Sequence, residues 1–318
     1  MNGNSLTHKH VELRLKTKKT TQTRDKFLTI NNLLNSTKIM ATTQAKANPK
    51  KKSSGFQGVR DAIWIIIACF ILAVCFFKFV LGNPDNFVGG DPANAVKDGS
   101  LLGTVYKGGI VVPVIITLLF TVIALSIERF FALRTAFGKS SLGKFVINVK
   151  QAINSGDMAK AQQICDKQQG CVANVVGASL VAYKEMENTP NLKRAAKVAK
   201  IQQAHEEATQ LEMPTLQMNM PILATIVTLG TLTALFGTVV GMIRSFAALA
   251  SGGGGDSLQL SEGISEALVN TASGILTSWF AVVAYNYYSN KIDKLTYALD
   301  EVGYTIAQTY EANHADEA

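Results

Sequence analysis

Apolar residues gather in four long stretches, and polar residues fill the segments between them. The stretches cover residues 62–81 and 110–133, then residues from about 216 to 249 and from about 264 to 288. A helix needs about 20 predominantly apolar residues to cross the hydrocarbon core of a bilayer, and each stretch reaches that length. The pattern therefore predicts an all-α integral membrane protein with four transmembrane helices, two of them extending into a cytoplasmic helical bundle.

The first stretch, 62–81, has two interpretations, a cleaved signal peptide or a retained anchor. Signal peptides carry an apolar core of about 7–15 residues, followed by a cleavage site between small residues. This run is longer, and no small-x-small site follows it. We therefore expect a retained transmembrane helix, in which the stem of Lys78 carries its ammonium group toward the membrane interface.

Basic residues follow the order that a membrane topology requires. They precede the first stretch and follow the second and the fourth, whereas the segments 82–109 and 251–257 hold few or none. Because cytoplasmic loops carry the excess of Lys and Arg, both termini and the segment 134–213 are expected in the cytoplasm. The residues behind this prediction are Lys50, Lys51, Lys52, Arg60, Arg129, Arg134, Lys139, Lys144, Lys150, Lys291 and Lys294.

These patterns divide the chain into seven segments. They are a disordered basic tail (1–61), an extra transmembrane helix (62–81), a periplasmic loop (82–109), a transmembrane helix (110–133), a cytoplasmic helical region (134–213), a two-helix membrane core (214–290) and a cytoplasmic C-terminal helix with its tail (291–318). Residues 214–249 are expected as one helix longer than the bilayer, which Pro214 and Pro221 start or kink.

The net charge of +8 is carried by the N-terminal tail. The first 60 residues contain 13 Lys and Arg against 2 Asp and Glu, which leaves a net charge of −3 on the rest of the chain. The basic character therefore belongs to a tail, and we expect no nucleic-acid partner. Met40 is a second candidate start, and the hypothesis is that translation begins there. The intact mass of the natively expressed protein would decide it.

Two amphipathic patterns outside the four stretches predict packed helices. One stripe repeats at helical spacing in the segment after the second stretch and consists of Leu142, Phe145, Val146, Val149 and Ile153. The other alternates steps of three and four residues, so the fourth helix should continue into the cytoplasm; it consists of Ile292, Leu295, Leu299, Val302 and Ile306.

Polar residues inside the last two stretches are the candidates for function. Hydroxyls in membrane helices mostly join helices or bond back to their own backbone, and that interpretation stays open for the threonines here. Glu266 differs, because an ionisable group within a span is costly and by default indicates function. It lies near the outer end of its stretch, so a solvated interfacial carboxylate is the alternative. Helical spacing places Glu266, Asn270, Ser273 and Thr277 on one stripe, and Thr271, Gly274 and Ser278 on a neighbouring one.

Gly237 and Gly241 form a small-xxx-small surface in the third stretch, which permits close contact between helices, and Gly274 in the fourth stretch is a third expected packing glycine. No Asp lies deep in any stretch. A proton that crossed the membrane through this chain alone would lack a central titrating group, so we expect a partner to supply that group.

The chain carries none of the common catalytic motifs. Walker, GxSxG and HExxH patterns are absent, and the four histidines are scattered outside the apolar stretches. Cys165 and Cys171 do not form a CxxC motif, and reduced structural thiols explain them better than a zinc site. We therefore expect no enzymatic activity, no cofactor and no metal.

Two long motifs resemble the signature helices of the ExbB/TolQ/MotA proton-channel family. They are PILATIVTLGTLTALFGTVVGMIRSF at 221–246 and GISEALVNTASGILTSWFAVVAYNYY at 263–288. Weaker similarities are SIERFFALRTA at 126–136 and INSGDMAKAQQICDKQQGCVANVV at 153–176, so the resemblance covers roughly 105–310. Two features depart from the family: relatives often have Pro where Thr231 stands, and the stretch 62–81 is an addition to the three-helix plan.

The resemblance implies a ring of five copies in the bacterial inner membrane, with a dimer of a single-span ExbD- or TolR-like partner in the central pore. The Asp of that partner would carry the proton, and the output would pass through a TonB-like protein to outer-membrane transport. Thr238 and Thr271 match the family's pore-lining threonines, and Glu266 matches its glutamate. Closest in pattern is ExbB. The alternatives left open are a TolQ-like or gliding-type motor and a non-conducting membrane scaffold. A secondary transporter is disfavoured, because this chain lacks the inverted repeat expected of that class.

Overall fold

The computed structural model describes residues 62–190, 192–251 and 257–314. Its helices are α2 (Ala62–Phe76), α3 (Leu101–Tyr106), α4 (Val112–Phe137), α5 (Leu142–Asn154), α6 (Met158–Gln168), α7 (Gly170–Glu187), α8 (Arg194–Gln217), α9 (Met220–Ser251) and α10 (Ser257–Asn313). A π-helical turn at Phe77–Leu81 prolongs α2, and 3₁₀ turns lie at Pro84–Asn86, Val88–Gly90 and Gly109–Val111. Within these ranges the chain forms no β-strand, only one isolated bridge between Phe87 and Val96.

Four of the described helices are long and apolar enough to cross a membrane. They are α2 with its π-helical turn, α4, α9 and the first part of α10, and each covers one of the four apolar stretches. The expectation of an all-α membrane protein with four such helices is therefore confirmed.

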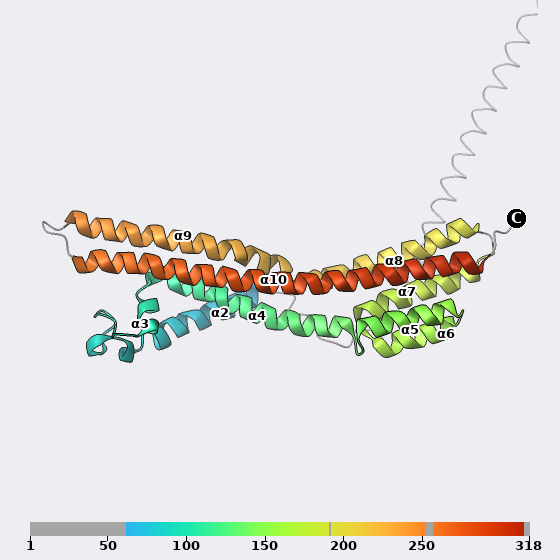
Figure 1. Cartoon of the computed structure of the whole chain (residues 1–318), viewed down its shortest axis with the longest axis horizontal. Coiled ribbons are helices and arrows are strands. Elements are labelled where there is room, and N and C mark those ends of the chain that lie inside the picture. Colours follow the sequence, from blue (N-terminus) through green and yellow to red (C-terminus); the bar gives the residue numbers. More distant parts are fainter. Residues whose placement is uncertain (1–61, 191, 252–256, 315–318) are drawn as a thin grey trace, which may run out of the picture. The chain divides into compact units, whose positions relative to one another are not determined.

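The longest helix, α10, has 57 residues and runs unbroken beside α9 and then into a helical bundle (Figure 1). At about 1.5 Å per residue it measures about 85 Å, far more than the bilayer core of about 30 Å. Its second half buries the predicted stripe completely or nearly so, from Ile292 to Ile306. The prediction that the fourth membrane helix continues as a packed helix is confirmed.

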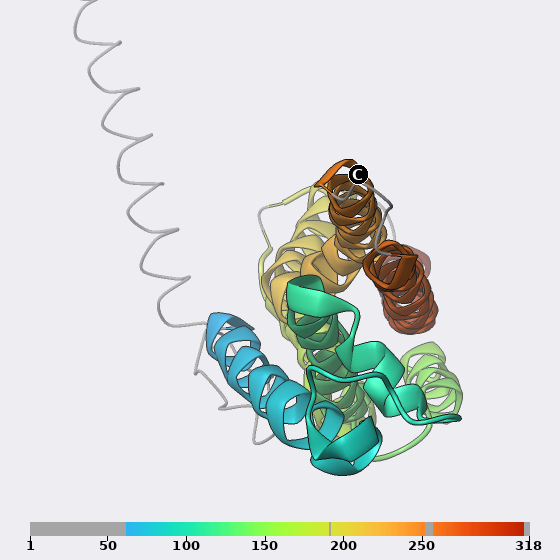
Figure 2. The same ribbon diagram turned by 90° about the vertical axis from the view of Figure 1, so that its left-hand side faces the viewer.

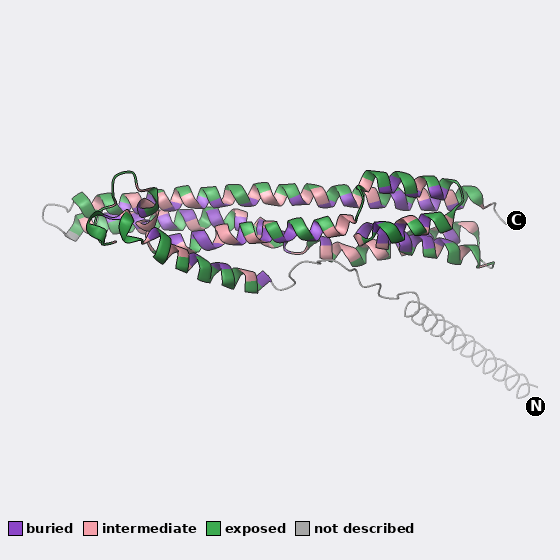
Figure 3. Cartoon of the chain, turned by 90° about the horizontal axis from the view of Figure 1, so that it is seen from below, coloured by how far each residue is buried: buried purple, intermediate pink, exposed green. Residues whose placement is uncertain are grey.

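The bundle consists of α5, α6, α7 and α8 around the second half of α10. The predicted stripe of α5 faces its core, with Phe145, Val149 and Ile153 almost fully buried. Figure 3 shows these helices with buried faces turned inward and exposed faces outward. In the same core His205 bonds to the hydroxyl of Ser179 at 2.9 Å, and burial lowers the pKa of His205 below its ordinary value.

The third membrane helix differs from the prediction at its start. Residues 214–249 do not form one helix, because α8 ends at Gln217 and α9 begins at Met220. Pro221 has no N–H group, and its ring would clash with the carbonyl of residue 217 in a continuous helix. The chain instead turns at Met218 and Asn219, and Asn219 takes a left-handed conformation with φ of 63°. Pro214 stays inside α8.

A buried ion pair of α4 supports this turn between α8 and α9. The Nε of Arg129 donates to Glu128 Oε2 at 2.6 Å, and Asn219 Nδ2 donates to the same oxygen at 3.2 Å. Arg129 Nη1 also points at the carbonyl of Thr215 in the last turn of α8, at 3.4 Å. A cation at a helix C-terminus is favourable because the carbonyl dipoles point toward it. Their mutual pairing offsets part of the cost of burying these charges.

The additional helix α2 packs on α4 (Figure 2). The segment that joins them is folded: Asn86 Nδ2 donates to the carbonyls of Val80 and Leu81 at 3.1 Å, and the rings of Phe77 and Tyr106 stack 4.7 Å apart. The helix α2 thus covers α4 rather than entering the hairpin of α9 and α10.

The predicted tail over residues 1–61, the start at Met40, the Gly-rich residues 252–256 and the last four residues lie outside the described residues. The remaining domain boundaries stay predictions.

Candidate ion-pathway site

Small residues bring α9 and α10 into close contact. An added Cβ at Gly237 would lie 2.6 Å from Asn270 Cβ, and one at Gly241 would lie 2.7 Å from the carbonyl oxygen of Gly263. On the opposite helix, Gly274 faces Ala234 and the carbonyl of Gly230. All three predicted packing glycines therefore lie in one seam within a single chain, where backbones approach too closely for a side chain.

The seam separates two polar faces of the hairpin. Thr238 and Thr271 lie on one side of it, half-buried, and their hydroxyls are hydrogen-bonded to each other across the two helices. Each hydroxyl also lies within bonding distance of a carbonyl of its own helix, Ala234 for Thr238 at 3.0 Å and Ala267 for Thr271 at 2.9 Å. The structure thus brings the two predicted pore threonines together.

This geometry leaves the two hydroxyls free to exchange their partners. A hydroxyl has one proton to donate and two lone pairs to accept with. The two protons of Thr238 and Thr271 serve three contacts, two to carbonyls and one between the hydroxyls. Either hydroxyl can therefore rotate to donate to a third group, or accept from one, at little cost in hydrogen bonds.

Glu266 lies on the other polar face. It precedes Thr271 by five residues, and at about 100° per residue the two side chains are separated by about 140° around α10. Its side chain is only 6% exposed and accepts from Arg244 Nη1 at 2.7 Å through both oxygens. The structure therefore does not bring Glu266 to the two threonines, and pairs it with a cation of α9 instead.

The stripe of α10 that contains Glu266, Asn270 and Thr277 contacts the residues just before α4. Asn270, fully buried, donates from Nδ2 to the carbonyl of Gly108 at 2.9 Å. Gly109 adopts φ of 76° and lies directly against the Glu266 carboxylate, where a side chain would not fit. Thr277 is buried as well, and its hydroxyl bonds back to Ser273. This face ties three helices together.

Arg244 is the functional candidate that sequence reasoning missed. It lies seven residues before Ser251, and Glu266 lies nine residues after Ser257. Two residues at similar distances on either side of a short turn meet when the helices fold back on each other. The signal available in the sequence was that Arg244 and Glu266 carry opposite charges within two neighbouring apolar stretches, where a charge is costly unless it is paired.

Replacing Arg244 by Gln is expected to destabilise the protein, because the Glu266 carboxylate then stays buried without its guanidinium partner. Breaking a fully buried pair costs about 3–5 kcal/mol. The loss here should be smaller, because the Arg244 side chain is 53% exposed and screened by solvent. The midpoint of thermal unfolding of the detergent-purified protein measures it.

The matched control is Lys150→Gln, which removes the exposed ion pair with Glu301 and should leave the midpoint within a degree or two. Adding Glu266→Gln to Arg244→Gln should recover part of the loss, because no unpaired charge then remains. Equal midpoints for Arg244→Gln and Lys150→Gln would show that the pair does not stabilise the hairpin.

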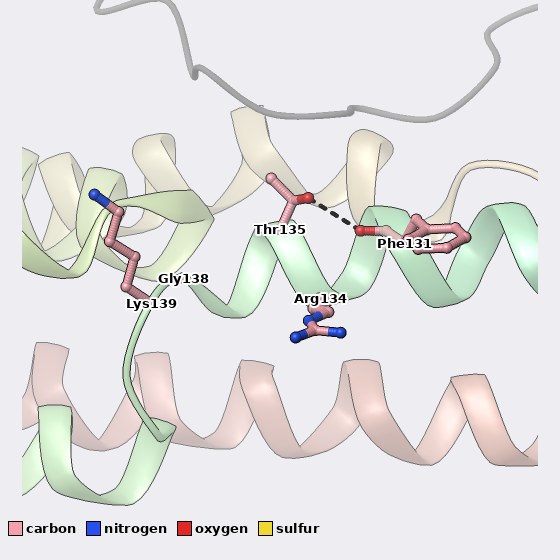
Figure 4. A pocket seen from close by; sticks show the side chains of 5 residues that line it. All are labelled: Phe131, Arg134, Thr135, Gly138 and Lys139. Atoms are coloured by element: carbon pink, nitrogen blue, oxygen red, sulfur yellow. Dashed lines mark hydrogen bonds between the residues drawn. The ribbon is translucent and has the colours of Figure 1, made fainter.

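A cavity of about 580 Å³ lies at the end of α4. Figure 4 shows its described lining, in which Thr135 donates to the carbonyl of Phe131 and the side chains of Arg134 and Lys139 point away from each other. Its polar groups do not converge on a common point. Across the described ranges, no group of His, Cys, Asp and Glu is arranged to hold a metal ion.

The glycine seam packs two membrane helices closely and leaves a pair of half-buried hydroxyls at one side of the hairpin. Residues 176–301 match the model of the MotA/TolQ/ExbB proton channel family. The chain is 30% identical over 196 residues to a biopolymer transport protein named ExbB-like 1 from Synechocystis sp., a match that covers 58% of this chain and 69% of that relative.

Two further relatives are Tol-Pal system proteins TolQ. The one from Pseudomonas aeruginosa is 29% identical over 143 residues, which is 44% of this chain and 59% of the relative. The one from Haemophilus influenzae is 38% identical over 89 residues, which is 28% of this chain and 39% of the relative. The protein belongs to the MotA/TolQ/ExbB proton channel family, and within it to the ExbB and TolQ type of motor subunit.

Proposed function

We propose that this protein is the ExbB-like subunit of a proton-driven motor in the bacterial inner membrane, which couples proton flow to TonB-dependent transport across the outer membrane. Copies of the chain, five by the family resemblance, form a ring. A single-span ExbD- or TolR-like protein occupies the pore, and a TonB-like protein receives the output. Thr238 and Thr271 line the ion path.

The observation that carries this proposal is a polar face without an acid of its own. The hydroxyls of Thr238 and Thr271 are half-buried in a single chain, so a neighbouring helix can reach them. The acids of the described membrane helices lie elsewhere: Glu128 in a buried pair near the end of α4, Glu262 on the surface near the start of α10, and Glu266 against Arg244. A membrane carboxyl from a partner, facing the two threonines, supplies the missing titrating group.

Hydroxyls suit such a site because they serve both protonation states of a carboxyl. They donate to a carboxylate and accept from a carboxylic acid, and the pair described above can switch between these roles. A proton that crosses the membrane releases about 2.3 kcal/mol per 100 mV. That energy is sufficient to shift an equilibrium between two conformations separated by a few kcal/mol.

Large apolar side chains on the outside of the hairpin support assembly with other copies and with lipid. In the single chain at least half of each is exposed, and they include Leu232, Phe236, Ile243, Leu268 and Trp279. Contiguous apolar surface of this kind marks contact with protein or membrane. The proposal keeps Glu266 near the outer end of the ion path, on the face opposite the two threonines; the Arg244 variants test what its ion pair contributes to stability.

The distribution of Lys and Arg supports an orientation with both termini and the helical bundle in the cytoplasm. In that orientation the joined ends of α9 and α10, with Arg244 and Glu266, face the periplasm. The bundle then surrounds the inner end of the path.

A TolQ-like motor is the second candidate, and it is favoured by the two relatives that carry that name. The two functions share the membrane machinery and differ in the protein that receives the output. The apolar and polar patterns of this chain suit both.

The test is to purify the natively tagged complex, identify its partners and record the phenotype of a deletion strain. We expect a single-span protein with a membrane Asp to copurify, and energy-dependent outer-membrane uptake to stop in the deletion strain. Normal uptake together with a leaky or poorly constricted envelope would support the TolQ-like function instead. If the purified complex lacks such a partner and conducts no protons in liposomes, the proposal is overturned, and a non-conducting membrane scaffold is the remaining interpretation.

A further inference from the structure

A second pair of hydroxyls joins α9 to α10 on the same face as Thr238 and Thr271. The Oγ atoms of Thr231 and Ser278 lie 3.1 Å apart. Thr231 precedes Thr238 by seven residues, and Ser278 follows Thr271 by seven. Seven residues make almost two turns of an α-helix, so each member returns to within about 20° of the same face and is displaced by about 10.5 Å. The hairpin of α9 and α10 thus has two hydrogen-bonded pairs of hydroxyls, at two levels along its length.

The seam holds the second pair in place as it holds the first. Gly230 lies beside Ser278, and an added Cβ there would lie 2.5 Å from the Ser278 Oγ and 3.2 Å from the carbonyl of Gly274. Thr231 is exposed in the single chain and Ser278 is half-buried. The two hydroxyls are therefore fixed relative to each other and reachable from the same open side as the first pair.

The surroundings of the second pair are apolar. Leu235 and Ile275 lie between the two levels and are 61% and 55% exposed. A path lined only by such side chains tends to lose its water. A hydroxyl pair two turns beyond Thr238 and Thr271 shortens the apolar distance on the side toward the helical bundle.

We propose that Thr231 and Ser278 line the ion path between the Thr238–Thr271 pair and the bundle, where their hydroxyls hold hydrogen-bonded water for the passing proton. The inference rests on the proposed function, since it extends the same path. The competing explanation is that the pair only joins the two helices, as hydroxyls in membrane proteins often do. The two explanations differ in what they predict for ion flow through an assembled complex.

The experiment compares Thr231→Val, Ser278→Ala and the double variant in the native complex with its partner, reconstituted in liposomes. Proton flux per assembled complex is measured under an imposed membrane potential. The matched control is Thr225→Val, because Thr225 is an exposed hydroxyl of the same helix that bonds to the carbonyl of its own Pro221 at 2.8 Å. We expect the double variant to lose at least tenfold in flux with normal assembly, and the control to keep wild-type flux.

Three other outcomes overturn the inference or the proposed function separately. If the double variant assembles poorly but its remaining complexes conduct normally, the pair is only a helix contact. If Thr238→Val stops flux while the double variant conducts like wild type, the path does not pass Thr231 and Ser278. If Thr238→Val also conducts like wild type, the proposed path itself is wrong.

A second readout does not depend on flux. Thr231→Cys and Ser278→Cys, placed in a background whose four cysteines Cys69, Cys75, Cys165 and Cys171 are replaced by Ala, should react with a small water-soluble thiol reagent in the assembled complex. A cysteine in place of the neighbouring Leu232, which the proposed function assigns to the side of α9 facing lipid or other copies, should react far more slowly. No difference between these positions would contradict a water-filled lining.

Discussion

Replacing Thr238 or Thr271 by Val is expected to reduce proton-driven output at least tenfold, while the complex still assembles. Val nearly matches Thr in shape, so the change removes the hydroxyl with little change in volume. Assembly should persist because one hydrogen bond between membrane helices contributes only about 0.6 kcal/mol on average. Output should fail because either change breaks the hydroxyl pair at this level, and only the intact pair can exchange partners and serve a partner's carboxyl in both of its protonation states.

Energy-dependent outer-membrane uptake measures the output, and gel filtration of the detergent-purified complex measures assembly. Thr225→Val is the control, because its exposed hydroxyl bonds within its own helix and lies on another side of α9. The reverse pattern, smaller complexes that still support uptake, would mean that the threonines only hold the helices together. Normal uptake in both threonine variants would remove them from the ion path.

Replacing Gly241 by Leu is expected to prevent folding of the hairpin and therefore assembly. An added Cβ at Gly241 lies 2.7 Å from the carbonyl oxygen of Gly263 and 2.8 Å from the backbone nitrogen of Ala267. Backbone atoms cannot rotate away as a side chain can, so α9 and α10 must separate along their whole seam. The cost should exceed the about 1–3 kcal/mol that is usual for an overpacked core.

The control is Gly143→Leu in α5, where an added Cβ meets nothing within 4 Å. That change should be neutral or slightly stabilising, because Leu is a better helix former than Gly. The amount of membrane-inserted protein and the size of the purified complex are the measurements. Gly237→Leu should resemble Gly241→Leu, because its neighbour is the fully buried Asn270. Complexes of normal size from either seam variant would refute the close contact.

The hydrogen bonds around Glu128 and Asn219 fix the turn between α8 and α9, which neither Pro214 nor Pro221 does alone. Pro221 prevents a continuous helix, but it does not decide where the chain goes next. Asn219 accepts a left-handed conformation more readily than most residues, and its side chain bonds to Glu128 of α4. The position of the start of α9 therefore depends on contacts with α4.

The sequence by itself determined the elements whose reason is local. Apolar length predicts the four membrane helices because an unpaired backbone is too costly in lipid, and the structure confirms them. Spacing of three and four residues predicts the buried stripes of α5 and α10, because a helix presents such residues on one face. The same spacing placed Thr271 and Glu266 on different stripes of one helix, and the motifs at 221–246 and 263–288 identified the family.

Only the tertiary structure decided which of these faces meet. The spacing of residues within α10 does not reveal that Glu266 is turned toward Arg244 and Gly109, since that depends on the register between α9 and α10. Register is set by the close approach of Gly237, Gly241 and Gly274, where a shift of one residue would drive side chains into backbone. The same register creates two hydroxyl pairs from four residues that are 33 and 47 positions apart in the chain. The proposed ion path is therefore a property of the packed hairpin, because the hydroxyls assigned to it belong to different helices.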